Sequence, residues 1–201
     1  QPPLYKLTRR SKEEYVETEE QLTRKLLELG ADEMSLDLGG EVLKGARLMS
    51  LLEILIMLEQ TGHRLAQKGI ALGEFLKERD PSTGRFPRYL VRVDNEKNAE
   101  RYFVRTDTEL KKLREEVESR IGKQLEIFDG QTEEKKDQPM FKWLEIHAGE
   151  SLGRLVSALE KKGFSVSQLE RSDKPLFELQ NGGTEKSAVH SLLEVLNAVR
   201  E

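Results

Sequence analysis

The pattern of apolar and polar positions predicts short strands that alternate with amphipathic helices. Apolar residues recur at helical spacing in some segments and at every second position in others. The predicted helices are 18–29, 44–68, 71–79, 106–121, 149–163 and 184–201. The predicted extended segments are 3–8, 14–16, 35–40 (a short strand or turn), 88–93, 101–106, 142–146, 165–170 and 175–180. We therefore expect an α+β fold, dominated by helices, with short antiparallel strands and hairpins.

Several residues indicate where these elements begin and end. Thr18 with Gln21, and Thr106 with Glu109, have the spacing of a capping box at a helix start. Gly30 follows the apolar stripe of the first helix and predicts its end as a C′ residue. The polar run between the segments 88–93 and 101–106 predicts a hairpin. Residues 129–138 contain no apolar anchor and are typical of a solvated surface loop.

Apolar residues surround the predicted helix 44–68 on almost every side. Such a helix is either buried on several sides or in contact with a partner. Its most apolar run, 48–60, is too short to span a bilayer and contains Glu53 and Glu59. The start of the chain has no signal-peptide pattern. We therefore expect a cytoplasmic protein without membrane contact.

The composition is that of a charge-rich chain that has enough apolar residues to fold. Of its 201 residues, 36% are hydrophobic and 35% are charged, and the net charge is -4. This length allows one sizeable core or two small ones. Because the net charge is negative, any contact with nucleic acid must come from a local basic patch. The absence of cysteine excludes disulfides, cysteine metal sites and thiol nucleophiles.

The sequence contains no recognisable catalytic motif. His63, His147 and His190 are far apart and lack the spacing of metal ligands. The segment GGEVLKGA, residues 39–46, lacks the Gly-Lys-Ser/Thr of a phosphate-binding loop. We therefore expect neither an active site nor a bound metal or cofactor in this chain.

Two clusters of basic residues are the candidate binding features. The first contains Lys6, Arg9, Arg10 and Lys12, and the second contains Arg85, Arg88, Arg92, Arg101 and Arg105. If the strands 88–93 and 101–106 pair, alternate arginines lie on one face and can follow a phosphate backbone. The alternative is a solvated strand face on which the arginines pair with acids such as Glu96 and Glu100. Both interpretations remain open at this point.

The first residues resemble the B subunits of DNA gyrase, a family of type IIA topoisomerases. The motif QPPLYK, Gln1, Pro2, Pro3, Leu4, Tyr5 and Lys6, resembles a segment of the Toprim domain in that family. The following YKLTRRSKEEYVETEEQL is similar to the family's hairpin and acidic helix. Family members without an insertion then continue into an RYKGLGEM-type segment, which is missing here. FKWLEIHAGESLGRLVSALEKKGFSVSQLE and HSLLEVLNAVRE resemble the later part of a Toprim insertion and its return helix.

This resemblance implies a division of the chain into three segments. Residues 1–30 would be the junction hairpin and helix, and residues 31–138 the helical middle of the insert with a hairpin near 88–106. Residues 139–201 would be a small αβ unit with the helix that returns to the Toprim core. The chain would then be an excised insertion with both of its junctions.

The resemblance also implies a function for the parent protein. The family uses ATP and Mg²⁺ to supercoil DNA negatively, as an A2B2 heterotetramer with the DNA gyrase A subunit. The catalytic, metal-binding and ATPase residues of the family lie outside this chain, so we expect no turnover from it. Its role would be a structural buttress that couples DNA binding to subunit contacts. The alternatives are a direct DNA-binding module without sequence specificity and an unrelated enzyme.

Overall fold

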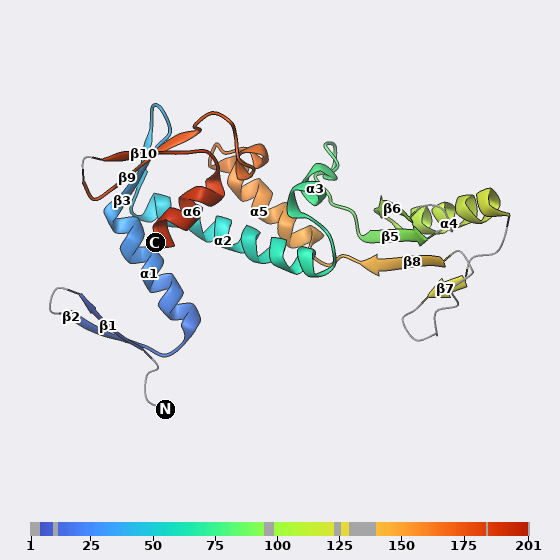
Figure 1. The fold of residues 1–201 in the computed structure, drawn as a ribbon, viewed down its shortest axis with the longest axis horizontal. Coiled ribbons are helices and arrows are strands. Elements are labelled where there is room, and N and C mark those ends of the chain that lie inside the picture. Colours follow the sequence, from blue (N-terminus) through green and yellow to red (C-terminus); the bar gives the residue numbers. More distant parts are fainter. Residues whose placement is uncertain are drawn as a thin grey trace. The chain divides into compact units, whose positions relative to one another are not determined.

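The fold is α+β, as the sequence predicts. A computed structural model describes residues 5–9, 12–94, 99–122, 126–128, 140–183 and 185–200 (Figure 1). Gln1 to Leu4, Arg10, Glu96 and the predicted loop 129–138 lie outside this range. The chain divides into two compact units, of which unit 1 is Gln1–Gln60 with Leu155–Glu201 and unit 2 is Thr61–Arg154. The three segments implied by the family resemblance stay a prediction.

The two units have different sets of elements. Unit 1 contains β1 (Tyr5–Arg9), β2 (Lys12–Val16), α1 (Glu19–Glu33), β3 (Met34–Asp37), β4 (Val42–Lys44), the 3-10 helix η1 (Val166–Leu169), β9 (Phe177–Asn181), β10 (Lys186–Val189) and α6 (Leu192–Arg200). Unit 2 contains α3 (Leu72–Lys77), β5 (Tyr89–Asp94), β6 (Ala99–Val104), α4 (Asp107–Ile121), β7 (Glu126–Phe128) and β8 (Met140–Glu145). The boundaries between the units fall within α2 (Ala46–Gln67) and α5 (Gly149–Lys161).

An antiparallel sheet of order β10-β9-β3-β4 organises unit 1. Leu36 of β3 lies opposite Leu43 of β4 and Leu179 of β9, and all three side chains are buried. Helices α1 and α6 lie side by side next to this sheet (Figure 1). In this sheet, β3 from the first part of the chain pairs with β9 from the last part.

Helix α2 supplies much of the apolar core. Five of its leucines have an exposure of 0%: Leu48, Leu51, Leu52, Leu55 and Leu58. These positions recur at helical spacing and lie on one broad face of α2, whereas Met57 on another side is 52% exposed, so burial on several sides is not found. No helix in the described part of the chain is long and apolar enough to cross a membrane.

The predicted first hairpin is confirmed, but β1 continues to Arg9 and β2 begins already at Lys12. Tyr5 lies opposite Val16, and the pairing continues to Arg9 opposite Lys12. Thr18 is the N-cap of α1, and its hydroxyl accepts a hydrogen bond from the Gln21 amide at 3.2 Å. The Gln21 side chain accepts from the Glu17 amide at 3.1 Å rather than from Thr18 itself. The capping pair therefore starts the helix as predicted, with a small change of partner.

The predicted end of the first helix at Gly30 is wrong, because α1 continues to Glu33. Gly30 has a packing role instead. A Cβ atom at this position would lie 2.8 Å from the carbonyl oxygen of Val199 in α6 and 2.9 Å from its Cγ1. Glycine therefore lets α1 and α6 approach closely.

Two predictions near the end of the chain are also wrong. The segment 165–170 is not extended, since Val166–Leu169 forms a 3-10 helix with a capping box between Ser165 and Gln168. The predicted helix 184–201 is divided, because Lys186–Val189 forms strand β10 before α6 begins at Leu192. The Ser191 hydroxyl accepts a hydrogen bond from the Glu194 amide at 3.2 Å, which caps the shorter helix. Pairing with β9 thus overrides the helical pattern of residues 186–189.

A sheet of order β6-β5-β8-β7 organises unit 2. The predicted hairpin is confirmed as the antiparallel pair β5–β6, and the predicted strand 142–146 overlaps β8 in residues 142–145. Tyr89, Val91 and Val93 of β5 form a core with Val117 of α4 and Phe141 of β8. Because strand side chains alternate, α4 covers the face of Tyr89, Val91 and Val93, and Leu90 and Arg92 belong to the other face.

The close approach at Gly30 predicts opposite effects for two helical glycines. Gly30→Ala should lower the free energy of unfolding by about 1–3 kcal/mol, because the methyl group meets a backbone oxygen that cannot rotate away. Gly153→Ala in α5 is the matched control, since its Cβ would have no neighbour closer than 3.8 Å. That substitution should be neutral or stabilise by up to about 1 kcal/mol, as expected for alanine in a helix. Urea unfolding measures both, and a stable Gly30→Ala protein would contradict the assigned packing.

Candidate functional site

The first basic cluster lies on the β1–β2 hairpin beside acidic residues. The Lys6 ammonium is 2.6 Å from the Glu13 carboxylate and 5.9 Å from the centre of the Tyr15 ring. Arg9 and Lys12 face each other across the hairpin, and only their backbones are described. Arg10 lies outside the described residues. The sequence segment 1–12 has no acid, but strand pairing brings Glu13 to Lys6.

The second basic cluster gathers around the β5–β6 hairpin. Arg92 and Arg101 are directly opposite in the register and so lie on one face of the sheet, as the alternating pattern predicts. Arg88 precedes β5 and Arg105 follows β6, at the other end of the same hairpin. Arg85 is exposed and lies further along the chain from these strands. The structure therefore brings four of the five arginines to one hairpin.

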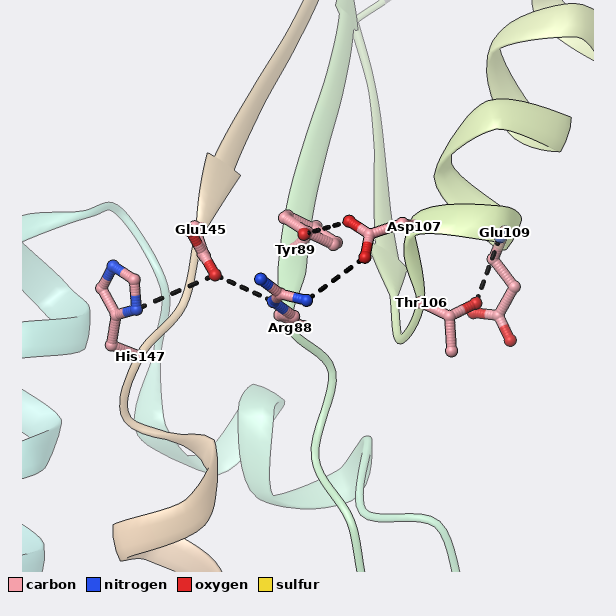
Figure 2. Close-up of polar contacts among 7 residues, drawn as sticks. All are labelled: Arg88, Tyr89, Thr106, Asp107, Glu109, Glu145 and His147. Atoms are coloured by element: carbon pink, nitrogen blue, oxygen red, sulfur yellow. Dashed lines mark hydrogen bonds and ion pairs between the residues drawn. The ribbon is translucent and has the colours of Figure 1, made fainter.

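Arg88 is the centre of a network of polar contacts that joins β5, β8 and α4 (Figure 2). Its Nε donates to the Glu145 carboxylate at 2.8 Å, and its Nη1 donates to Asp107 at 3.3 Å. The Tyr89 hydroxyl donates to the other oxygen of Asp107. The Nδ1 atom of His147 is 4.0 Å from Glu145. Each carboxylate thus serves two partners.

Aromatic contacts and a helix terminus support the same network. The guanidinium of Arg88 lies 5.1 Å from the centre of the Tyr89 ring, and Trp143 meets that ring edge-on at 5.5 Å. Asp107 is in the first turn of α4, where a negative charge interacts favourably with the helix dipole. The Thr106 hydroxyl accepts from the Glu109 amide at 3.2 Å and caps this helix as predicted.

These contacts shift the pKa values of two groups. The hydrogen bond to Asp107, together with burial, raises the pKa of Tyr89 above its ordinary value. The hydrogen bond to Glu145 raises the pKa of Arg88, which stays charged in any case. Both shifts stabilise the protonated form of the donor. Because Arg88 binds both Glu145 of β8 and Asp107 of α4, the network links these two elements within unit 2.

Arg92 and Arg101 lie against the C-terminal end of α2. The Nη2 atom of Arg101 donates to the Gly69 carbonyl at 3.0 Å, and that of Arg92 to the Lys68 carbonyl at 3.5 Å. Gly69 has φ +71 and ends the helix in the left-handed conformation. Cations near the carbonyls of a helix end are stabilising. This contact explains how two arginines tolerate direct opposition in the sheet.

The remaining contacts differ from those that the sequence suggests. Arg105 donates to the Glu78 carbonyl at 2.7 Å. Glu100, proposed as an arginine partner on the strand face, binds Arg120 of α4 at 2.6 Å and accepts from the Tyr102 hydroxyl. Glu96 lies outside the described residues. The arginines of the hairpin thus use Glu145, Asp107, Glu74 and backbone carbonyls as partners.

Sequence reasoning misses two lysines near this hairpin. Lys142 of β8 lies opposite Arg92, and the Lys68 ammonium donates to the Glu145 carbonyl at 3.2 Å. Both are distant from the arginines in the sequence, so no local pattern relates them. Within the described ranges, no group of three or more His, Cys, Asp or Glu residues could hold a metal ion.

Comparisons with protein-family models and with curated proteins found no match to this chain. The chain is an α+β protein with two small mixed units. Its candidate site is a basic sheet face beside the network of contacts around Arg88.

The raised pKa of Tyr89 predicts a loss of stability in alkali. Because the folded-state pKa of Tyr89 lies above the unfolded value of about 10, the hydrogen bond to Asp107 contributes fully to the free energy of unfolding below about pH 10. It is lost as the pH rises through the folded-state pKa. Tyr89→Phe and Asp107→Asn should each flatten the fall of unfolding free energy at high pH, measured by urea unfolding at a series of pH values. An alkaline slope unchanged in Tyr89→Phe would contradict the assignment.

Proposed function

We propose that this chain is an insert of the Toprim region of a DNA gyrase B subunit and acts there as a non-catalytic structural buttress. The single observation that carries the proposal is the resemblance of the first residues, QPPLYK and the following hairpin and acidic helix, to that family. The antiparallel pairing of β1 with β2 and the Thr18 cap of α1 support it, because they have the order of elements that the resemblance requires.

The hairpin also has surfaces suited to a parent sheet. Neither β1 nor β2 pairs with a further strand among the described residues, so each has an open hydrogen-bonding edge. Tyr15 is 58% exposed and Leu26 of α1 is 50% exposed. Exposed apolar side chains on the hairpin and on the helix that follows it favour docking onto another protein surface. In the parent, this surface would be the Toprim core.

The contacts of the arginines favour a buttress over a DNA-tracking module. Arg88 bonds to two carboxylates, and Arg101 and Arg105 each donate to a backbone carbonyl within unit 2. Lys6 is paired with Glu13. A side chain that stabilises its own fold in this way contributes less charge to a DNA surface.

The parent protein would be the enzyme in this proposal. It would supercoil DNA negatively with ATP and Mg²⁺ as an A2B2 heterotetramer with the DNA gyrase A subunit, in the cytoplasm. The insert would couple DNA binding to subunit contacts without performing chemistry.

The proposal predicts topoisomerase activity for the polypeptide that carries this chain. Purified together with the A subunit, that polypeptide should supercoil a relaxed plasmid in the presence of ATP and Mg²⁺. Gel electrophoresis of the plasmid measures the product. A complete lack of supercoiling and relaxation, by a polypeptide that is folded and binds the A subunit, would reject the family assignment.

A variant pair tests the buttress itself. Tyr15→Ser with Leu26→Ser in the parent should reduce supercoiling by about tenfold or more, since the loss of each large apolar contact weakens docking. The thermal stability of the isolated chain should change little, because both side chains are exposed. Val42→Ser, at a residue that is 48% exposed on β4, is the matched control and should retain activity. Equal activity of the double variant and the control would exclude this docking surface.

A further inference from the structure

Three cations form a row across the second sheet. In the register, Arg92 of β5 lies opposite Arg101 of β6 on one side and opposite Lys142 of β8 on the other. Directly opposite residues point to the same face of a sheet, and neighbouring strands are about 4.8 Å apart. The three charges therefore lie close together, on the face opposite to α4.

A cavity of about 500 Å³ lies on this face. Its cationic lining residues are Lys68, Arg92 and Lys142, and its apolar lining residues include Leu90 and Leu144. Leu90 and Leu144 are directly opposite in the register, two residues from Arg92 and Lys142 on the same face. In the described part of the chain, no carboxylate lines the cavity. The cavity thus combines concentrated positive charge with an apolar wall.

The helix end compensates the two arginines only in part. Like charges directly opposite each other destabilise a sheet. The carbonyls of Lys68 and Gly69 each accept one hydrogen bond from an arginine, whereas a guanidinium carries five N–H donors. The carboxylate of Glu74 forms an ion pair with Arg101 at 3.7 Å, whereas the contact of Arg92 is with a carbonyl. The partial charge on one carbonyl does not neutralise the full charge of Arg92, so an anion beside Arg92 would be stabilised.

We propose that this cavity is a binding site for phosphate groups carried on an apolar or aromatic framework. A guanidinium fork matches the geometry of phosphate oxygens, and lysines add point charges. Leu144, which is 37% exposed, provides the apolar surface against which a sugar or base packs. The phosphate belongs either to a nucleic-acid backbone or to a free nucleotide, and both sources present this chemistry. The site does not depend on membership of the gyrase family.

Direct titration of the full chain tests the site with one probe for each phosphate source. ATP serves as the nucleotide probe, followed by isothermal titration calorimetry. A short fluorescent DNA duplex serves as the backbone probe, followed by fluorescence anisotropy. Each is titrated at low and at moderate salt, and binding of either probe should weaken steeply with salt.

Lysine variants at the cavity and on α4, which covers the opposite face of the sheet, make the test specific. Lys142→Ala combined with Lys68→Ala should weaken binding by about tenfold or more, as expected for the loss of charge-assisted hydrogen bonds. Lys142→Arg should retain it. Lys111→Ala combined with Lys112→Ala is the matched control, because it removes the same charge from exposed positions on α4. Thermal unfolding of each variant verifies that it is folded.

The outcomes separate the two phosphate sources. Binding of the duplex alone supports the site and assigns it to nucleic acid, and binding of ATP, with or without the duplex, supports it and assigns it to free nucleotides. No binding of either probe at low salt, or an equal loss of affinity in both double variants, overturns the proposal. Because no A subunit is present, this result is independent of the outcome of the supercoiling assay.

Discussion

The antiparallel pairing of β3 with β9 is the interaction on which unit 1 depends. It places Leu36 opposite Leu179, and the Gly182 amide donates to the Glu33 carbonyl at 2.7 Å just beyond the strand ends. Pairing strands so distant in the sequence costs loop-closure entropy, which burial of apolar side chains must offset. Once the strands pair, α1 and α6 meet, and only glycine fits at position 30. The Arg200 guanidinium then binds Glu59 through two hydrogen bonds of 2.7 and 3.1 Å, which attaches α6 to α2.

In unit 2, the main constraint is the repulsion between arginines that lie beside one another on the β5–β6 hairpin. The surrounding elements supply partners of the opposite polarity. Glu145 and Asp107 hold Arg88, and the carbonyls at the end of α2 face Arg92 and Arg101. These contacts stabilise unit 2, which supports the proposed role of the chain as a structural buttress. Lys142 and Lys68 add positive charge beside Arg92, and this face of the sheet is the proposed phosphate site.

Local patterns predicted those elements whose boundaries depend on near neighbours. The caps at Thr18 and Thr106 and the hairpin β5–β6 follow from side chains a few residues apart, and they are found as expected. The end of α1 and the strand β10 were mispredicted because distant partners decide them. Gly30 signals a helix end locally but instead accommodates Val199, and residues 186–189 pair with β9 despite a helical pattern. The basic hairpin was found from sequence, but its partners were not.

The sequence by itself determined the α+β class, the alternation of short strands with helices, the apolar face of α2 and the β5–β6 hairpin with its arginines. Periodicity and capping are local properties, so they can be read along the chain. Only the tertiary structure decided that Lys142 completes the row of cations and that Glu145 and Asp107 share Arg88. These contacts join strands and helices from distant segments, and sheet register between such segments is fixed by packing in three dimensions.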